Sequence, residues 1–480
     1  MYYAYITRLK NLHKHPNADR LQLGECFGNT VVVSLDYVDN QLGIYFPSDG
    51  QLSVEFATVN NLVRKKDEAG NNIGGYMDPD KRNVTAIKLR GEKSDGLFLP
   101  LSSLESFGDI STLTEGDRID LFNGHEICKK YIPCKQRRSG HVNEGNRTRK
   151  KRAPISPLFT EHADTEQLAY NLGAFQHGDM VEITLKMHGT SQRTGYLPML
   201  TGYKDNLICR IRNWWRHLLN KLDDHHREDI HTGEPIYEWG YVSGTRRVVL
   251  ENFDDGYYGS NEFREPHSKF FEGKLNKGET VYYEVVGFTT NGTPIMSSCE
   301  NKKTQDKEFI RQYGETTCFS YGCYPEDQRT MFGEDDTSYY SITEPAPQSD
   351  FYVYRMTFKN EDGHEVDYTP DYVRYRCEQM GCKSVPVFET FIIPERSKCR
   401  SASRHIISPG EYVMERAEKY YDGPDPIGKT HIREGVVVRI INRPRFAAYK
   451  HKNFSFKVLS GIISESVNTD SISDDILSEL

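Results

Sequence analysis

A lysine at the end of a strand-like run is the first residue of this chain whose setting suggests chemistry. Lys186 follows VEITL and precedes His188 and Gly189 in the stretch EITLKMHGTSQRTG. An amine attacks an electrophile only when it is unprotonated, and neighbouring cations or partial desolvation favour that form. Gly189 would let the backbone turn tightly beside a ligand. By itself a Lys-x-x-Gly motif is better explained by a surface lysine before a turn, so the hypothesis of a nucleophile needs support from elsewhere in the chain.

That support comes from charged and aromatic residues in later strand-like runs. In chain order they are Glu284, Tyr354, Glu434, Lys450, Lys452 and Lys457. Each fits ordinary strand patterning, although a carboxylate directly before the buried run GVVV, as at Glu434, is less expected. The set suits nucleotidyl transfer, in which a lysine attacks the α-phosphate of a nucleoside triphosphate. The other lysines would neutralise the developing charge, carboxylates would hold metal or ribose, and an aromatic ring would stack on the base.

The order of these motifs, over about residues 186 to 460, resembles the covalent nucleotidyltransferase superfamily of RNA ligases, DNA ligases and mRNA capping guanylyltransferases. In YVSGTRRVVL the resemblance implies that Arg246 contacts phosphate, with Arg247 as the alternative. It also implies roles for the remaining residues. These are Lys186 as nucleophile, Glu284 on ribose and metal, Tyr354 on adenine, Glu434 on metal, Lys450 and Lys452 on the α-phosphate with Lys457 as their rival, and Gly189 and Arg193 near the nucleotide.

Within the superfamily, KMHGTSQR, SGTRRVVL, VYRMT and HIREGVVVRI are most similar to RNA ligases. A small β-rich region precedes the motifs, and HPNADRLQLGECFGNTVVV is similar to OB-type nucleic-acid-binding modules. An OB domain before the ligase domain resembles RNA ligases that seal 3′-OH/5′-phosphate nicks in duplexes whose 3′-OH strand is RNA. The resemblance therefore implies an ATP-dependent RNA ligase that uses Mg²⁺ or Mn²⁺ and a lysyl-AMP intermediate. A DNA ligase, a GTP-dependent capping enzyme and an inactive RNA-binding protein of the same fold remain as alternatives.

One position departs from the superfamily pattern. The residue two places after the lysine is often an aspartate that helps to place metal-bound water, whereas here it is His188. A neutral imidazole can hold a water but supplies no negative charge, so we expect Glu284 and Glu434 to carry more of the metal binding. An insertion at 197–236 that contains Trp214 and Trp215 has no assigned counterpart, and core packing explains it better than RNA stacking.

The mixture of strand-like and helical runs predicts an α+β fold. We expect more than one domain, because 480 residues are too many for a single core. We predict an OB-like β-barrel at 1–127, a basic linker at 128–154, an antiparallel-sheet nucleotidyltransferase domain at 155–462 and a disordered acidic tail at 463–480. In the barrel, Lys88, Arg90 and Lys93 either contact phosphates or form a solvated face. GEYVMERAEKYY and NWWRHLLNKLDDHHRED are the clearest predicted helices.

Charge and cysteine usage limit the partners. The net charge is −8, with 61 Lys and Arg against 69 Asp and Glu, which by itself argues against nucleic acid. Ten of those bases lie at 128–152 with one acid, however, and like charges at that density favour a phosphate-contacting strap over a solvated hinge. No apolar run or leader predicts a membrane span or secretion, so we expect a cytoplasmic monomer. The pairs Cys318/Cys323 and Cys377/Cys382 could bind zinc, but ordinary reduced thiols explain them better.

Overall fold

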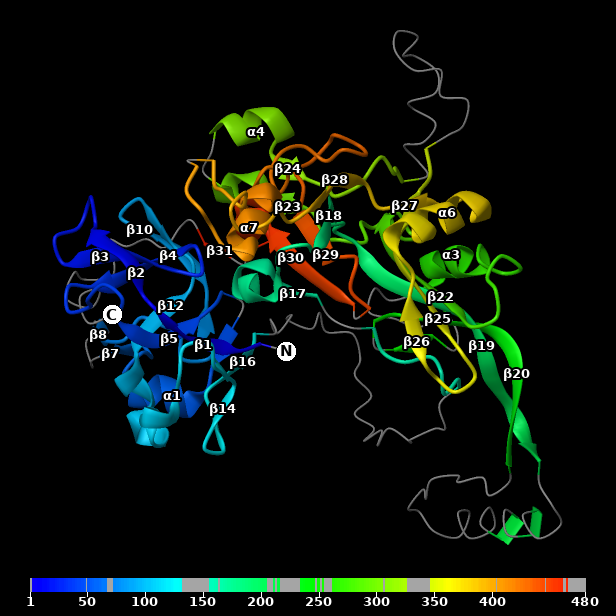
Figure 1. Ribbon diagram of the computed structural model, residues 1–480, viewed down its shortest axis with the longest axis horizontal. Coiled ribbons are helices and arrows are strands. Elements are labelled where there is room, and N and C mark those ends of the chain that lie inside the picture. The colour runs from blue at the N-terminus through cyan, green and yellow to red at the C-terminus, as the bar shows by residue number, and fades with distance from the viewer. Residues whose placement is uncertain are drawn as a thin grey trace. The chain divides into compact units, whose positions relative to one another are not determined.

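The computed structural model is mixed α/β, rich in strands and poor in helices (Figure 1). It describes residues 2–48, 50–66, 72–131, 155–162, 165–204, 210–211, 214–215, 234–246, 248–250, 253, 261–304, 307–325, 346–402, 404–444, 446–460 and 463–464. The chain forms two compact units. The first comprises Met1–Arg138, Cys299–Thr316 and Phe454–Leu480, and the second comprises Ser139–Ser298 and Thr317–Asn453. The sequence divides the chain at continuous boundaries, whereas the structure adds two later segments to the first unit.

The first unit is built from short strands in several small sheets. Its main sheet has the order β12-β5-β1-β13, formed by Leu97–Pro100, Leu42–Phe46, Ala4–Arg8 and Arg118–Ile119. Three further sheets have the orders β2-β3-β4 (Lys10–Lys14, Leu21–Cys26, Asn29–Ser34), β16-β6-β9 (Cys128–Lys130, Gly50–Leu52, Asn83–Val84) and β11-β10-β31 (Glu92–Ser94, Ala86–Leu89, Ile463–Ser464). Ile6 lies opposite Ile44 in the antiparallel β1–β5 pair, and both are fully buried in the core with Phe56 of helix α1 (Val54–Val59). The OB-like topology stays a prediction.

The end of the chain belongs to this first unit. Helix α8 (Phe454–Leu459) places Val458 against Ala86, and β31 pairs in parallel with β10. Within α8, the Lys457 ammonium lies 2.8 Å from the Asp95 carboxylate. Helix α4 (Lys307–Tyr313) and a 3₁₀ turn at Asn301–Thr304 complete the inserted segment.

The described residues of the second unit form two large sheets. The five-stranded sheet has the order β17-β30-β29-β18-β28, formed by Glu166–Gln167, Ala447–Lys452, Gly435–Ile440, Met180–Leu185 and Val387–Ile392. The seven-stranded sheet has the order β21-β20-β19-β22-β25-β26 with β27 beside β25, formed by Val249–Leu250, Glu234–Gly244, Thr190–Lys204, Glu279–Gly287, Ser349–Lys359, Glu365–Asp367 and Lys383–Ser384. β19 and β20 form a long antiparallel hairpin that extends from this sheet (Figure 1).

Local sequence explains these elements. The runs MVEITL and GVVVRI bury β-branched residues in the centre of the five-stranded sheet, as their composition predicts. The predicted helix at GEYVMERAEKYY is α7 (Pro409–Glu418), which begins with a capping box between Ser408 and Glu411. Helix α6 (Pro370–Met380) ends at Gly381, whose positive φ of 72° suits the left-handed cap. A third helix, α3, spans Glu265–Lys269.

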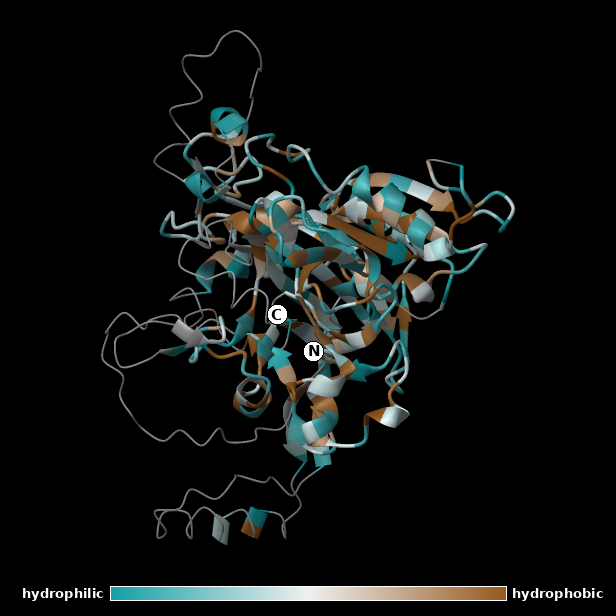
Figure 2. Cartoon of the chain, turned by 90° about the vertical axis from the view of Figure 1, so that its left-hand side faces the viewer, coloured by the Kyte–Doolittle hydropathy of each residue, from teal (hydrophilic) through white to brown (hydrophobic). Residues whose placement is uncertain are grey.

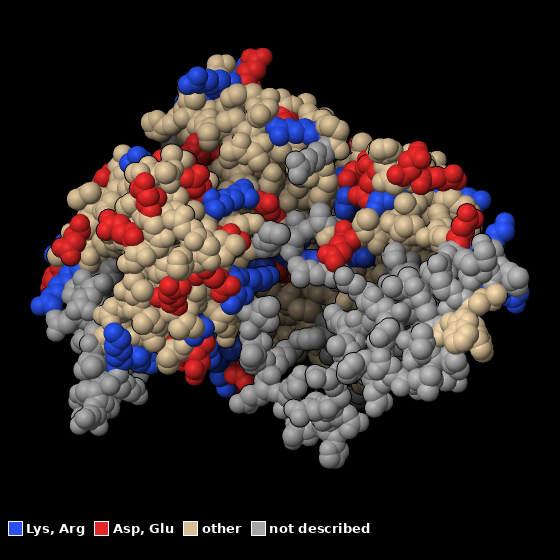
Figure 3. Space-filling view, turned by 90° about the horizontal axis from the view of Figure 1, so that it is seen from below, with Lys and Arg blue, Asp and Glu red and all other residues tan. Residues whose placement is uncertain are grey.

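Figure 2 shows hydrophobic and hydrophilic residues interspersed along the strands and the helices. Three large clusters of buried side chains form the cores: one in the first unit, one beneath the seven-stranded sheet and one beneath the five-stranded sheet. On the face shown in Figure 3, Lys and Arg are interspersed with Asp and Glu over the described surface. No helix in the described part of the chain is both long and apolar enough to cross a bilayer.

Several predictions fall outside the described residues. They are most of the basic linker (132–154), the tail from 465, Arg247, and the helix NWWRHLLNKLDDHHRED apart from two tryptophans. Those two, Trp214 and Trp215, are 58% and 53% exposed and contact each other edge to face. Exposure of this kind does not fit the core packing expected for the insertion.

Candidate functional site

The pairing of three strands brings the predicted nucleophile to the predicted metal ligand. Lys186 follows the last residue of β18, and its backbone N–H donates to the Gly435 carbonyl at 3.0 Å. Glu434 immediately precedes β29, which lies beside β18. In the antiparallel β29–β30 pair, Gly435 lies opposite Lys452. Lys186, Glu434 and Lys452 therefore meet at the same end of three neighbouring inner strands of the five-stranded sheet.

Glu434 is the centre of this group. Its Oε1 atom lies 2.8 Å from Lys186 Nζ and 3.3 Å from Lys452 Nζ. Its Oε2 atom lies 3.2 Å from His188 Nδ1. The carboxylate is 2% exposed, and although burial opposes its ionisation, Lys186, Lys452 and His188 together hold the pKa of Glu434 well below its usual range. A buried anion with cations on two sides is thus fixed at the point where the lysine would react.

His188 occupies the position where the superfamily often has aspartate. Burial lowers the pKa of the His188 imidazole, against the opposing effect of Glu434, so the ring is neutral at pH 7. A neutral ring gives no negative charge to this side of the site. Its Nδ1 atom faces Glu434 Oε2 at 3.2 Å.

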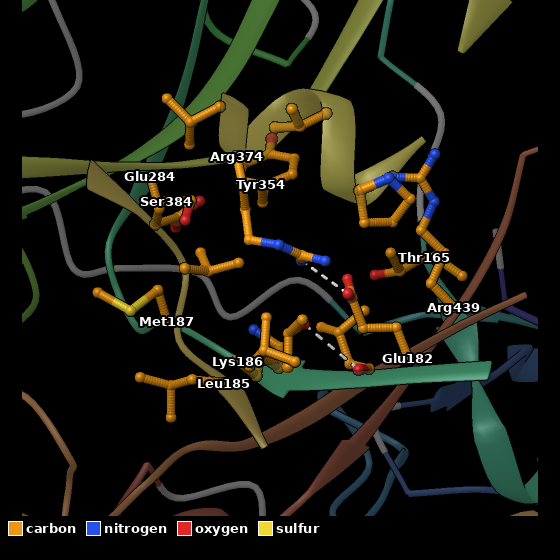
Figure 4. Close-up of a pocket in the computed structure, with 18 of the residues that line it drawn as sticks. Thr165, Glu182, Leu185, Lys186, Met187, Glu284, Tyr354, Arg374, Ser384 and Arg439 are labelled. Atoms are coloured by element: carbon orange, nitrogen blue, oxygen red, sulfur yellow. Dashed lines mark hydrogen bonds and ion pairs between the residues drawn. The ribbon is translucent and has the colours of Figure 1, made fainter. Parts of the chain in front are cut away.

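A cavity of about 120 Å³ lies beside the lysine (Figure 4). Four of the residues predicted from the sequence line it, namely Lys186, Arg246, Glu284 and Tyr354. Val437 and Phe446 add apolar surface, which suits the flat face of a nucleobase. The cavity therefore combines an apolar wall, a lysine and an arginine.

Glu284 and Tyr354 come from adjacent strands of the seven-stranded sheet. Burial raises the pKa of the Glu284 carboxyl to about 7, with Glu434 adding to the rise and Lys186 and Arg246 opposing it. The Tyr354 hydroxyl and Ser191 Oγ are hydrogen-bonded at 3.0 Å. One face of Tyr354 stacks on His162, with 5.7 Å between ring centroids.

Other predicted residues lie elsewhere. Arg193 is 2% exposed, and its guanidinium packs over the Phe159 ring at 4.3 Å. It donates hydrogen bonds to the backbone carbonyls of Thr245 and Arg246 and so holds the segment that carries Arg246. It does not line the cavity. Lys457 is paired with Asp95 in the first unit.

Gly189 and Lys450 have backbone-defined positions. A Cβ atom at Gly189 would lie 2.3 Å from the Val285 carbonyl oxygen, so glycine permits the close approach of the nucleophile turn to β22. Lys450 lies two residues before Lys452 on the same face of β30 and pairs with Val437, and it is half-buried outside the cavity lining.

The cavity also contains residues that the sequence reading missed. Glu182 and Thr184 line it, and both share the face of β18 that leads to Lys186, so the period of two along the strand could have identified them. The Glu182 carboxylate is 2.7 Å from Arg374 of α6 (Figure 4). Arg374 and His162 come from distant segments and carry no motif, so no sequence signal identified them.

Comparison with known proteins gives the fold of this chain. No protein-family model matches the sequence, and no curated protein matches it. Solved structures of a Naegleria gruberi RNA ligase do match. The complex with pyrophosphate has a TM-score of 0.50 at 15% identity, covering 95% of this chain and 97% of that one. A variant with AMP and manganese gives 0.52 at 14%, covering 94% and 97%, and a variant with ATP and manganese gives 0.51 at 15%, covering 96% and 98%.

This chain shares the fold of an RNA ligase. The likeness extends over nearly the whole length of both chains, so both units take part in it. At 15% identity it concerns the fold alone, and the chemistry must be argued from the residues of the site.

The cysteines carry no metal signal in the described part of the chain. Cys318, Cys377 and Cys382 are among the described cysteines that are reduced thiols. Among the described residues, no group of three or more His, Cys, Asp or Glu side chains is arranged to hold a metal ion.

Proposed function

We propose that this protein is an ATP-dependent RNA ligase that joins 3′-OH and 5′-phosphate ends through a covalent lysyl-AMP intermediate. The observation that carries the proposal is the contact of two lysines with one buried glutamate at the ends of β18, β29 and β30. Lys186 and Lys452 share one oxygen of the buried Glu434, beside a cavity lined by Arg246, Glu284 and Tyr354. This group occurs in a chain with the fold of an RNA ligase solved with ATP and AMP.

In the first step the Lys186 amine would attack the α-phosphorus of ATP. A P–N bond forms, the bond from the α-phosphorus to the bridging oxygen breaks, and pyrophosphate leaves with the electron pair. Lys186 must first lose a proton to water before its amine can attack. Its Nζ lies 2.8 Å from Glu434 Oε1, and Lys452 Nζ lies 3.3 Å from the same oxygen, so the two side chains share one carboxylate.

In the later steps a 5′-phosphate oxygen of RNA attacks the lysyl-AMP phosphorus, and the P–N bond breaks. The lysine regains its proton, and the RNA carries a 5′,5′-linked adenylate. The 3′-OH then attacks the RNA phosphate, and AMP leaves. Lys452, which shares the Glu434 carboxylate with Lys186, and Arg246, which lines the cavity, would stabilise negative charge on the phosphate in each step.

The site also fits a divalent cation. Glu284 and Glu434 supply carboxylate oxygens, the ligands that Mg²⁺ and Mn²⁺ prefer, and the negative charge of Glu434 already raises the pKa of Glu284. Two carboxylates are enough for a metal whose other ligands are water and substrate phosphates. Bound there, the cation would neutralise charge on the triphosphate and the leaving pyrophosphate.

The nucleic-acid substrate is part of the same proposal. We propose a nicked duplex whose 3′-OH strand is RNA, bound by a monomer in the cytoplasm. Support comes from the basic segment at 128–152 and from the first unit, whose largest segment, Met1–Arg138, precedes the catalytic residues.

Labelled nucleotide tests the first step. The protein is incubated with α-labelled ATP or GTP and Mg²⁺ or Mn²⁺, denatured and examined for retained label. We expect an ATP-specific adduct that Lys186→Met abolishes and that Lys398→Met, at an exposed lysine, leaves intact. A GTP-specific adduct would indicate a capping enzyme, and the absence of any adduct would favour a non-catalytic RNA-binding protein.

Nicked duplexes test the substrate. Four nicks that differ only in whether the 3′-OH and 5′-phosphate strands are RNA or DNA are sealed under single-turnover conditions. We expect sealing to require RNA on the 3′-OH side. Equal sealing of an all-DNA nick would refute the RNA preference while leaving the lysyl-AMP chemistry in place.

A further inference from the structure

A buried tyrosine contacts the backbone of the turn that carries the nucleophile. Tyr321 is 3% exposed, and its hydroxyl accepts a hydrogen bond from the His188 backbone N–H at 2.7 Å. The strand hydrogen bonding of β18 ends just before this point, with the Lys186 N–H on Gly435. The Tyr321 hydroxyl therefore takes over as acceptor where the strand ends, two residues beyond the nucleophile.

The tyrosine is itself held in place. Tyr321 has a positive φ of 51°, and the following turn is closed by a hydrogen bond from the Cys323 N–H to the Ser320 carbonyl at 2.9 Å. Gly428 packs against this backbone so closely that a Cβ there would lie 2.7 Å from the Gly322 nitrogen. A non-glycine residue in the left-handed region persists only when its surroundings hold it there.

The support behind the ring is a buried histidine and aspartate. The Tyr321 ring meets His431 edge to face at 4.5 Å. His431 is fully buried, and its Nδ1–H donates to the Ile432 carbonyl at 2.8 Å. Asp425, also fully buried, accepts from the Gly428 N–H at 2.6 Å and so fixes the loop that presses on Tyr321. Phe319 packs between the His188 ring, at 4.6 Å, and the His431 ring, at 5.2 Å.

The hydroxyl stays neutral in this setting. Burial raises the pKa of Tyr321 well above its usual range, and the carboxylates Glu434, Asp425 and Glu284 raise it further. A neutral hydroxyl can accept from the His188 N–H without adding a negative charge beside Glu434.

We propose that Tyr321 is a positioning residue that fixes the 186–189 turn, and with it Lys186 and His188, through the hydrogen bond to the His188 backbone. Its kinetic consequence rests on the proposed lysyl-AMP chemistry, whereas the hydrogen bond itself can be tested without that chemistry. The predicted role is in the rate of attack by Lys186 and not in binding of ATP, because Tyr321 does not line the cavity.

The test compares Tyr321→Phe with a matched control. Tyr241 also accepts a backbone N–H through its hydroxyl, from Gly273 at 2.6 Å, and it lies in β20 outside the site. Tyr241→Phe therefore removes the same kind of bond. For Tyr321→Phe we expect the single-turnover rate of lysine adenylylation to fall about tenfold with the KM for ATP within about twofold, because small misplacements of reacting groups reduce rates strongly. Tyr241→Phe should keep the wild-type rate.

Hydrogen exchange supplies a readout that needs no activity. The His188 amide should exchange about tenfold faster or more in Tyr321→Phe than in wild type, and at the wild-type rate in Tyr241→Phe. Gly428→Ala retains the Tyr321 hydroxyl but displaces the 321–322 backbone that positions it, so it should change both measurements in the same direction. Unchanged exchange and unchanged adenylylation in Tyr321→Phe would overturn the inference. A wild-type protein that forms no adduct would refute the proposed function, and exchange would then decide the role of Tyr321 alone.

Discussion

The substitution Glu434→Gln removes the one negative charge that three side chains share. The carboxylate contacts Lys186, Lys452 and His188 at 2.8, 3.3 and 3.2 Å and is 3% exposed in its side chain. Glutamine keeps the shape and two hydrogen-bonding groups but not the charge. The two ammonium groups then face each other across a neutral amide, so we expect the second unit to lose stability independently of any loss of activity.

The contacts of Glu434 set the size of the expected loss in unfolding free energy. Breaking a buried ion pair by removing one partner costs about 3 to 5 kcal/mol. The partners here are about one fifth exposed, at 20% for Lys186 and 18% for Lys452, so solvent relieves part of that cost. We therefore expect Glu434→Gln to lower the free energy of unfolding of the second unit by about 2 to 4 kcal/mol.

The assay can isolate this unit. The three tryptophans, at 214, 215 and 239, all belong to the second unit, so intrinsic fluorescence during urea unfolding reports on that unit alone. Measuring Glu434→Gln, Lys452→Met and the double variant gives the coupling energy between positions 434 and 452. Asp350→Asn is the control, because its partner Lys383 is 61% exposed and the change should cost no more than about 1 kcal/mol.

Two results would refute the reasoning. A loss below about 0.5 kcal/mol for Glu434→Gln would mean that the buried carboxylate is not held as its contacts indicate. A coupling energy between Glu434 and Lys452 indistinguishable from zero would mean that the two side chains do not share a charge in solution, even if the single variants were destabilised.

Further predictions concern pH and the residues outside the cavity. Because the folded-state pKa of Glu434 is lowered, its stabilisation should be present above about pH 4.5 and lost as pH falls further, a loss that urea unfolding of Glu434→Gln should not show. Glu284 has the opposite sign: its folded-state pKa of about 7 lies above the reference value of 4.5, so the wild type should lose up to about 3 kcal/mol between pH 4.5 and 7 in metal-free buffer, and Glu284→Gln should not. Lys457→Met should lower the thermal stability of the first unit, where it pairs with Asp95, and leave lysine adenylylation within about twofold of wild type; a loss of adenylylation would restore Lys457 as the rival phosphate contact. Arg193→Met should destabilise the second unit by about 2 to 4 kcal/mol by tryptophan fluorescence, because it leaves backbone carbonyls near Arg246 without their donor.

Much of the fold could be predicted from sequence because it depends on local pattern. The runs MVEITL, TVYYEVVGF, FYVYRMTF and GVVVRII are all strands, and the capped run after Ser408 is a helix. The predicted α+β class agrees with the strand-rich mixed fold. The alternation of buried residues in strands and the cap residues of helices act within a few positions. They can therefore be recognised in the sequence without knowledge of distant contacts.

The candidate site, too, depends partly on local sequence and partly on contacts between distant segments. Lys186 and Glu434 could be singled out from their places at the ends of strand-like runs, and Lys452 from the order of motifs that resembles the superfamily. The tertiary structure was needed to show that the pairing of β18, β29 and β30 brings both lysines onto the Glu434 carboxylate. It also decided that Tyr321, in a segment without a motif, holds the turn after Lys186. Strand register and packing between distant segments set these distances, and neither is encoded in any short window of the chain.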